Sequence, residues 1–98
     1  MTNYVLSPNA ARSIADINKY TIDNFGERQA VRYLQNFRDR FNNLVDNPKL
    51  GTKRDDIKTG CYSYFEVSHT IYYKSLGDTI AIIDVLHQSM EPAQHLPD

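Results

Sequence analysis

Histidine and cysteine are the residue types that most often bind metals or transfer protons, and this chain has three histidines and one cysteine. His69 falls at an expected turn, His87 at an expected strand end and His95 in the C-terminal tail, with Cys61 far from all three. Zinc ligands usually occur in pairs within about six residues of each other, and this chain has no such pair. Structural or surface roles are therefore the favoured interpretation, and the sequence predicts neither a metal nor a cofactor.

Motifs for other kinds of catalysis are also missing. The chain has no Gly-x-Ser-x-Gly motif and no glycine-rich phosphate-binding loop. The adjacent acids Asp55 and Asp56 are most simply the solvated end of a loop. The motifs therefore do not predict an enzyme.

Tyrosine is unusually frequent, with seven copies. Tyr62, Tyr64, Tyr72 and Tyr73 are expected to cluster across two adjacent strands. Cross-strand aromatic pairs commonly serve only to pack a sheet. Half-buried tyrosines with free hydroxyls are also typical of protein-binding surfaces, so both interpretations stay open.

Asp84 is the one charged residue in the otherwise apolar run 80–86. Burying its carboxylate alone would be costly, so it must meet water, a partner or a cation. Lys74 or a helical arginine could supply that cation.

The elements that position these residues begin with a short strand at 4–6. Ser7 and Pro8 then form a typical helix start, a capping hydroxyl followed by proline in the first turn. Apolar and small residues recur at helical spacing up to Gly26, where glycine can end the helix. A second helix follows and ends before Pro48. Its stripe consists of Ala30, Leu34, Phe37, Phe41 and Leu44.

Two amphipathic helices joined at Gly26 predict an antiparallel hairpin, and their stripes require a sheet to cover them. After a polar connection at 49–60, three strands are expected at 61–67, 69–75 and 79–87, with a polar tail at 89–98. The predicted fold is α+β, in the order β-α-α-β-β-β, with the hairpin on a small antiparallel sheet. At 98 residues it forms a single domain, 1–98.

Charge is unevenly distributed along the chain. Residues 1–54 hold nine Lys/Arg against five Asp/Glu, whereas residues 55–98 hold two against seven. A basic helical half suits an acidic protein partner, although chance unevenness explains it equally well. A predicted pI near 6.3 and the lack of a dense basic stripe disfavour nucleic acid. A single cysteine and a start unlike a signal peptide lead us to expect a cytoplasmic protein with no membrane contact.

Several short segments, in order along the whole chain, are similar to those of ParE-family toxins from bacterial type II toxin–antitoxin systems. They are Tyr4-x-Leu6-Ser7-Pro8-x-Ala10, Ile17-x-x-Tyr20, Phe25-Gly26-x-x-Gln29-Ala30-x-x-Tyr33, Asn47-Pro48-x-x-Gly51, Gly60-Cys61, His69-x-Ile71-x-Tyr73 and Val85-Leu86-His87-Gln88-x-Met90-x-x-x-x-His95-Leu96. The fold that the resemblance implies is the one derived above.

The resemblance implies a function directed at partner proteins. ParE toxins resemble the RelE-type ribosome-dependent messenger ribonucleases in fold but poison DNA gyrase, and a cognate antitoxin wraps a helix and an extended segment around them. The resemblance thus implies a hetero-oligomer with an antitoxin and DNA gyrase as the target. It also implies no direct DNA binding by the toxin alone and no catalysis.

Ribonuclease relatives carry Lys and Arg on the exposed sheet face, because cleaving a phosphodiester needs cations around the phosphate. The comparable positions here are Ser63, Phe65, Thr70 and Ser89, none of them basic. Lys74 is the one cation left on the middle strands, and Asp84 would repel phosphate. The comparison favours ParE-type action.

The chain also departs from the ParE pattern. Family members usually carry arginine where this chain has Tyr62, Asp84 and Ser89, and often at Lys74. Two alternatives therefore stay open. One is a ribosome-dependent messenger endonuclease using Tyr62, Tyr72, Lys74 or His87, and the other is a decayed toxin that only binds its antitoxin.

Candidate contact residues follow from exposure, charge and the resemblance. Those expected to bind the antitoxin are Arg28, Arg32, Tyr33, Tyr62, Tyr64 and Tyr72. Those expected to bind the target are Lys74, Asp84, His87, Gln88, Met90, His95 and Leu96.

Overall fold

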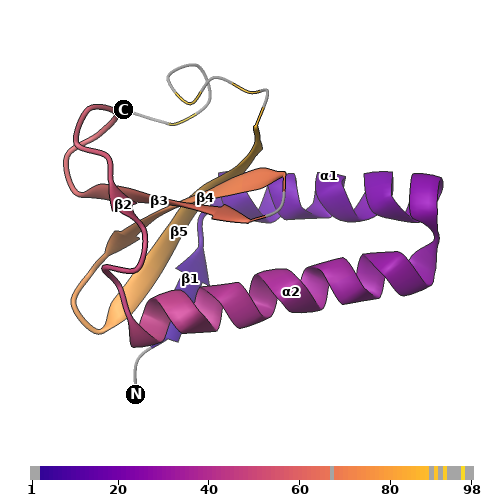
Figure 1. The fold of residues 1–98 in the computed structure, drawn as a ribbon, viewed down its shortest axis with the longest axis horizontal. Coiled ribbons are helices and arrows are strands. Elements are labelled where there is room, and N and C mark those ends of the chain that lie inside the picture. The colour runs from indigo at the N-terminus through magenta and orange to yellow at the C-terminus, as the bar shows by residue number, and fades with distance from the viewer. Residues whose placement is uncertain (1–2, 67, 89, 91, 93–95, 97–98) are drawn as a thin grey trace.

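The protein forms a helix hairpin packed on a mixed sheet (Figure 1). This computed structural model describes residues 3–66, 68–88, 90, 92 and 96. The elements are β1 (Asn3–Leu6), α1 (Pro8–Phe25), α2 (Glu27–Asp46), β2 (Thr52–Lys53), β3 (Cys61–Glu66), β4 (His69–Ser75) and β5 (Thr79–His87). The α+β class and the order of the long elements are as the sequence predicts.

Both helices begin and end at residues with clear local causes. The Ser7 hydroxyl accepts a hydrogen bond from the Ala10 amide at 3.0 Å, and proline follows it in the first turn of α1. Gly26 separates α1 from α2 with φ 91° and ψ 167°. That backbone conformation is essentially restricted to glycine, so this residue allows the chain to reverse within one position.

The sheet order is β1-β5-β4-β3-β2, and two of its features differ from the sequence-based prediction. β1 pairs in parallel with β5, whereas an antiparallel sheet was expected. After the helix hairpin and strands β3 and β4, the chain comes back to β1, and β5 lies beside β1 and runs in the same direction. The second difference is β2, a two-residue strand within the connection expected to lack structure, which pairs with β3.

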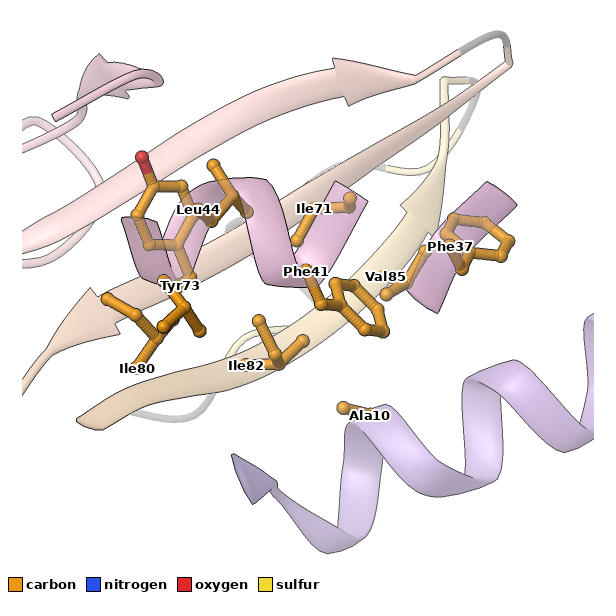
Figure 2. Packing of buried hydrophobic residues seen from close by; sticks show 10 residues of the cluster. Ala10, Phe37, Phe41, Leu44, Ile71, Tyr73, Ile80, Ile82 and Val85 are labelled. Carbon is orange, nitrogen blue, oxygen red and sulfur yellow. The ribbon is translucent and has the colours of Figure 1, made fainter. Parts of the chain in front are cut away.

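One hydrophobic core lies between α2, the start of α1 and the sheet (Figure 2). Phe37, Phe41 and Leu44 of α2 point at the sheet and are at most 3% exposed. The aromatic ring of Tyr4 lies 5.2 Å from that of Phe41, which ties β1 to the same layer. The sheet contributes Ile71, Tyr73, Ile80, Ile82 and Val85. The predicted stripe of the second helix is thus confirmed, with Leu34 only half-buried.

The opposite face of the sheet has a smaller core. Cys61, Tyr72 and Leu86 are buried there, with Ile57, Ile83 and Leu96 packed against them. This face is therefore covered in part by Ile57 of the 49–60 connection and by Leu96 near the C-terminus. Within the described residues, the helices are too polar or too short to cross a lipid bilayer.

Candidate functional site

A cavity of about 790 Å³ lies between the helix hairpin and the adjoining ends of β4 and β5. Its walls combine aliphatic and aromatic side chains with a few polar groups, as in sites that bind other molecules. α1 lines it with Ser13, Asp16, Ile17, Tyr20, Thr21 and Phe25, α2 with Gln29, Tyr33 and Asn36, and the sheet side with Ser68, His69, Val85, His87 and Met90.

The cavity exists because the two helices extend farther than the sheet that they pack against. The hairpin projects past the sheet, so its distal turns have no strand beneath them (Figure 1). Tyr20 and Phe25 lie in this region and are 62% and 66% exposed, with their rings 6.5 Å apart in an edge-to-face contact. Large exposed aromatic groups at one rim are typical of protein interaction sites.

The floor of the cavity holds a polar cluster around His69. The Tyr33 hydroxyl lies 2.7 Å from Nδ1 of His69, and the Ser68 hydroxyl lies 3.3 Å from the same nitrogen. The His69 ring stands edge-on to that of His87 on the neighbouring strand, with ring centroids 5.3 Å apart. Burial lowers the pKa of His69, and repulsion from His87 lowers it further. Burial likewise raises the pKa of the Tyr33 hydroxyl.

Three residues expected to contact an antitoxin lie on α2 at or beside this cavity. Tyr33 lines it, together with Gln29 and Asn36 one turn away on either side. Arg28 and Arg32 are exposed. Neither lines the cavity, and because each precedes a lining residue by one position, its side chain projects about 100° around the helix from that residue.

The predicted tyrosine cluster is wrong as a single surface, because the strands place its members on opposite faces. Tyr62 pairs with Tyr73 on the helix side, with rings stacked 5.6 Å apart. Tyr64 lies on the same side, and the Arg40 guanidinium lies over its ring, 5.0 Å from the centroid of the Tyr64 ring. Tyr72 pairs with Ser63, faces away from the helices and is only 4% exposed. It packs in the smaller core and has little surface to offer a partner.

The residues expected to contact a target are similarly divided. His87 and Met90 line the cavity beside Tyr33. Gln88 is exposed at the end of β5, where its amide donates to the Ser68 carbonyl at 2.9 Å. Lys74 and Leu96 lie on the opposite side of the sheet, Lys74 paired with Cys61 and Leu96 packed on the smaller core. His95 lies outside the described residues.

Asp84 is buried and bound by uncharged donors, which corrects two expectations. It is 4% exposed, and its Oδ1 accepts from the Ser13 hydroxyl at 2.6 Å and from the Val85 amide at 2.8 Å. These donors take the place of the expected lysine or arginine. A residue this deeply buried supports the junction of α1 and β5 and cannot itself form a contact surface.

Among the described residues, few side chains on these surfaces could take part in phosphate or metal chemistry. Lys74 is the one Lys or Arg in the three long strands β3, β4 and β5. In the part of the chain that the structure describes, no three His, Cys, Asp or Glu side chains gather as metal ligands would. The Asp55 carboxylate accepts from the Gly60 amide, and Asp56 pairs with Arg54, so these two acids organise their own loop.

Sequence reasoning missed His69, Tyr20 and Phe25 as cavity residues. His69 was assigned to a turn, although alternation along its strand places it on the same face as Ile71 and Tyr73. Tyr20 and Phe25 are five positions apart in the last turns of α1, a spacing that no helical stripe of three and four residues includes. An aromatic residue directly before the hairpin glycine was the available signal.

Comparisons with known proteins agree over nearly the whole chain. The model of the family described as ParE toxin of type II toxin–antitoxin system, parDE, matches residues 4–92. Toxin ParE1 of Mycobacterium tuberculosis is 33% identical over 96 residues, covering 97% of this chain and 98% of that protein. Toxin ParE1 of Caulobacter vibrioides is 30% identical over 96 residues, covering 98% and 99%.

A solved structure of the chromosomal ParDE TA system from P. aeruginosa has the same fold. Its matching chain aligns with a TM-score of 0.72 at 16% identity, over 89% of this chain and 95% of that one. At such low identity the agreement concerns the fold alone.

Proposed function

The chain belongs to the ParE toxin family of type II toxin–antitoxin systems, and from this we propose a two-part function for it. A cognate antitoxin neutralises it by binding in the cavity between the helix hairpin and the sheet. When released, it inhibits DNA gyrase in the cytoplasm by protein–protein contact, without catalysis of its own.

The cavity is the observation that carries this proposal. Its volume of about 790 Å³ and its exposed aromatic rim suit the apolar face of a partner helix or a short extended segment. Arg28 and Arg32 are exposed on α2 outside the cavity, so an acidic segment that continued from the cavity over this helix would gain charge complementarity there. The fold shared with a chain of the chromosomal ParDE TA system from P. aeruginosa also supports an antitoxin as the partner.

Neutralisation follows if the two predicted contact sets overlap. Tyr33, expected to bind the antitoxin, lines the same cavity as His87 and Met90, expected to bind the target. A segment bound in the cavity would cover all three. The antitoxin would then block gyrase by occlusion, with no change in the toxin's fold.

Ribonuclease action is the less favoured alternative. The transition state of phosphodiester cleavage needs several cations and a proton-transfer group held around the phosphate. β3, β4 and β5 together offer Lys74, and the carboxylate of Asp84 is engaged by Ser13. Their electrostatics support binding of a protein better than cleavage of RNA.

The first experiment is a plasmid supercoiling assay with purified gyrase. The chain is titrated with and without the product of the gene adjacent to its own. Inhibition that the neighbouring product relieves is the expected result. A folded sample that binds the neighbouring product and leaves gyrase active would reject gyrase as the target.

Transcript cleavage separates the enzymatic alternative. The chain is incubated with messenger RNA and translating ribosomes, and the 5′ ends of the fragments are mapped. We expect no toxin-dependent cleavage. Ribosome-dependent cuts that disappear when Tyr72 or Lys74 is replaced would instead establish a nuclease.

A further inference from the structure

Two histidines face each other on adjacent strands at the floor of the cavity. His69 and His87 are register partners in β4 and β5, and their ring centroids are 5.3 Å apart. Both rings also line the cavity that a partner segment would fill. In the free chain His69 is half-buried and His87 is exposed. Histidine is the side chain whose charge changes most readily near neutral pH, so a partner that covered this pair would make its binding sensitive to acid.

The surroundings of His69 favour its neutral form. Its Nδ1 is 2.7 Å from the Tyr33 hydroxyl on α2, and the ring of Phe37 stands edge-on at 6.0 Å. The pKa of His69 is lowered first by burial and then by the charge of His87. A segment that filled the cavity would remove more water from both rings and strengthen both effects.

Other charged groups face this pair from each neighbouring element. α1 contributes Asp16 to the cavity wall. Glu66 of β3 is the register partner of His69 and is held by Arg40 of α2 through an ion pair at 2.5 Å. Since the guanidinium balances the Glu66 carboxylate, Asp16 is the one acid among the described residues of the cavity wall that could favour a protonated ring.

We propose that the His69–His87 pair makes antitoxin binding sensitive to pH. The occupied cavity accommodates both imidazoles in the neutral form, and protonation of either places a desolvated charge beside the other ring and against the bound segment. Acidification below about pH 6.5 therefore loosens the antitoxin. This inference rests on the proposed antitoxin site and adds a means of regulating it.

The test compares affinities at two pH values. Binding of the full chain to the product of the adjacent gene is measured by calorimetry at pH 7.5 and pH 5.5. The measurement is repeated with the double variant His69→Gln, His87→Gln, whose amides keep hydrogen-bonding capacity without titrating. Using the variant removes the contribution of titrating groups on the partner.

We expect the wild-type dissociation constant to rise between these pH values by roughly tenfold more than that of the double variant, since each pKa unit of coupling corresponds to a factor of about ten. A difference below about threefold would overturn the proposal while leaving the antitoxin site intact. Absence of binding at pH 7.5 would overturn both.

A second measurement covers the case in which the double variant fails to fold. Proton NMR of the imidazole C2 hydrogens gives the pKa of each histidine in the free wild-type chain and in the complex. We expect the pKa of His69 to fall further on binding, because a bound segment deepens its burial. An unchanged or raised pKa of His69 would reject the proposal without any substitution.

Discussion

At the scale of single residues, Tyr73 has a role that its sequence context does not suggest. Its ring is fully buried, its hydroxyl donates to the Pro48 carbonyl at 2.9 Å, and it accepts from the Gly51 amide at 2.9 Å. A Cβ on Gly51 would lie 2.6 Å from that hydroxyl and from the Ser63 carbonyl. One phenol therefore ties the chain after α2 to the sheet, through a glycine that no larger residue can replace without movement.

Replacing Tyr73 with phenylalanine tests this anchor. We expect Tyr73→Phe to lower the free energy of unfolding by about 1–3 kcal/mol, because the Pro48 and Gly51 backbone groups lose their partner. Urea denaturation followed by circular dichroism measures the change. Tyr20→Phe, which removes an exposed hydroxyl, is the matched control and should change stability by less than about 0.5 kcal/mol. Equal midpoints for the two variants would contradict the anchoring role.

Sequence reasoning at this scale succeeded where the cause is local and failed where it is not. It predicted that Asp84 needs a partner, because an isolated buried carboxylate is costly. It could not name Ser13, which lies 71 positions earlier in the chain. The register of β4 on β5 also shifts between Tyr72 and Tyr73, next to Asp84. Simple alternation cannot show such a bulge.

At the scale of elements, the start of α1 shows how a local signal acquires a tertiary function. Ser7 and Pro8 predict the helix start from sequence alone. In the structure the Ser7 hydroxyl accepts from the Ala10 amide and also donates to the Ile83 carbonyl of β5. The Ser7 amide also donates to the Ile82 carbonyl at 3.0 Å, at the end of the parallel pairing of β1 with β5. Such contacts between distant segments are not visible in local sequence patterns, so the sequence predicted the strand but not its direction.

A series of substitutions at Ser7 separates the two functions. Ser7→Ala removes both hydrogen bonds and should cost about 1–2 kcal/mol of stability. Ser7→Asp keeps the cap without the hydrogen bond to Ile83, so its stability should lie between that of the wild type and that of Ser7→Ala. The stability of Ser7→Thr should stay close to that of the wild type. Thermal and urea unfolding give the order. An aspartate variant no better than alanine would show that the contact with β5 dominates.

The exposed face of α2 carries a prediction about charge. Arg28 and Arg32 are exposed on α2 outside the cavity, and we expect an acidic antitoxin segment to pass beside them. The double substitution Arg28→Glu, Arg32→Glu should weaken antitoxin binding at least about tenfold at low salt and less at high salt, because exposed charges are screened. Arg12→Glu, on α1, is a control with a single substitution of the same kind. Unchanged affinity of the double variant would place the partner elsewhere.

At the scale of the whole molecule, the cavity is the feature that sequence patterns could not supply. It arises where α1, α2 and the ends of β4 and β5 meet, from residues spread between Ser13 and Met90. Periodicity predicts which face of each helix is apolar, but not how far a helix extends beyond its sheet. The family resemblance pointed to a partner-binding protein, and the packing of these elements indicates where the partner would lie.

The exposed aromatic rim of the cavity provides the sharpest test of that location. Tyr20 lines the cavity and is 62% exposed, while Val31 is 56% exposed on α2 and does not line it. Tyr20→Ala should weaken antitoxin binding by about 10–100-fold, as for an interface hot spot, whereas Val31→Ala should change it by less than about threefold. Both exposed sites should leave unfolding unchanged within about 0.5 kcal/mol, so lost affinity reports the interface. Calorimetry with the adjacent gene's product decides, and equal effects of the two variants would mean that the antitoxin uses another face.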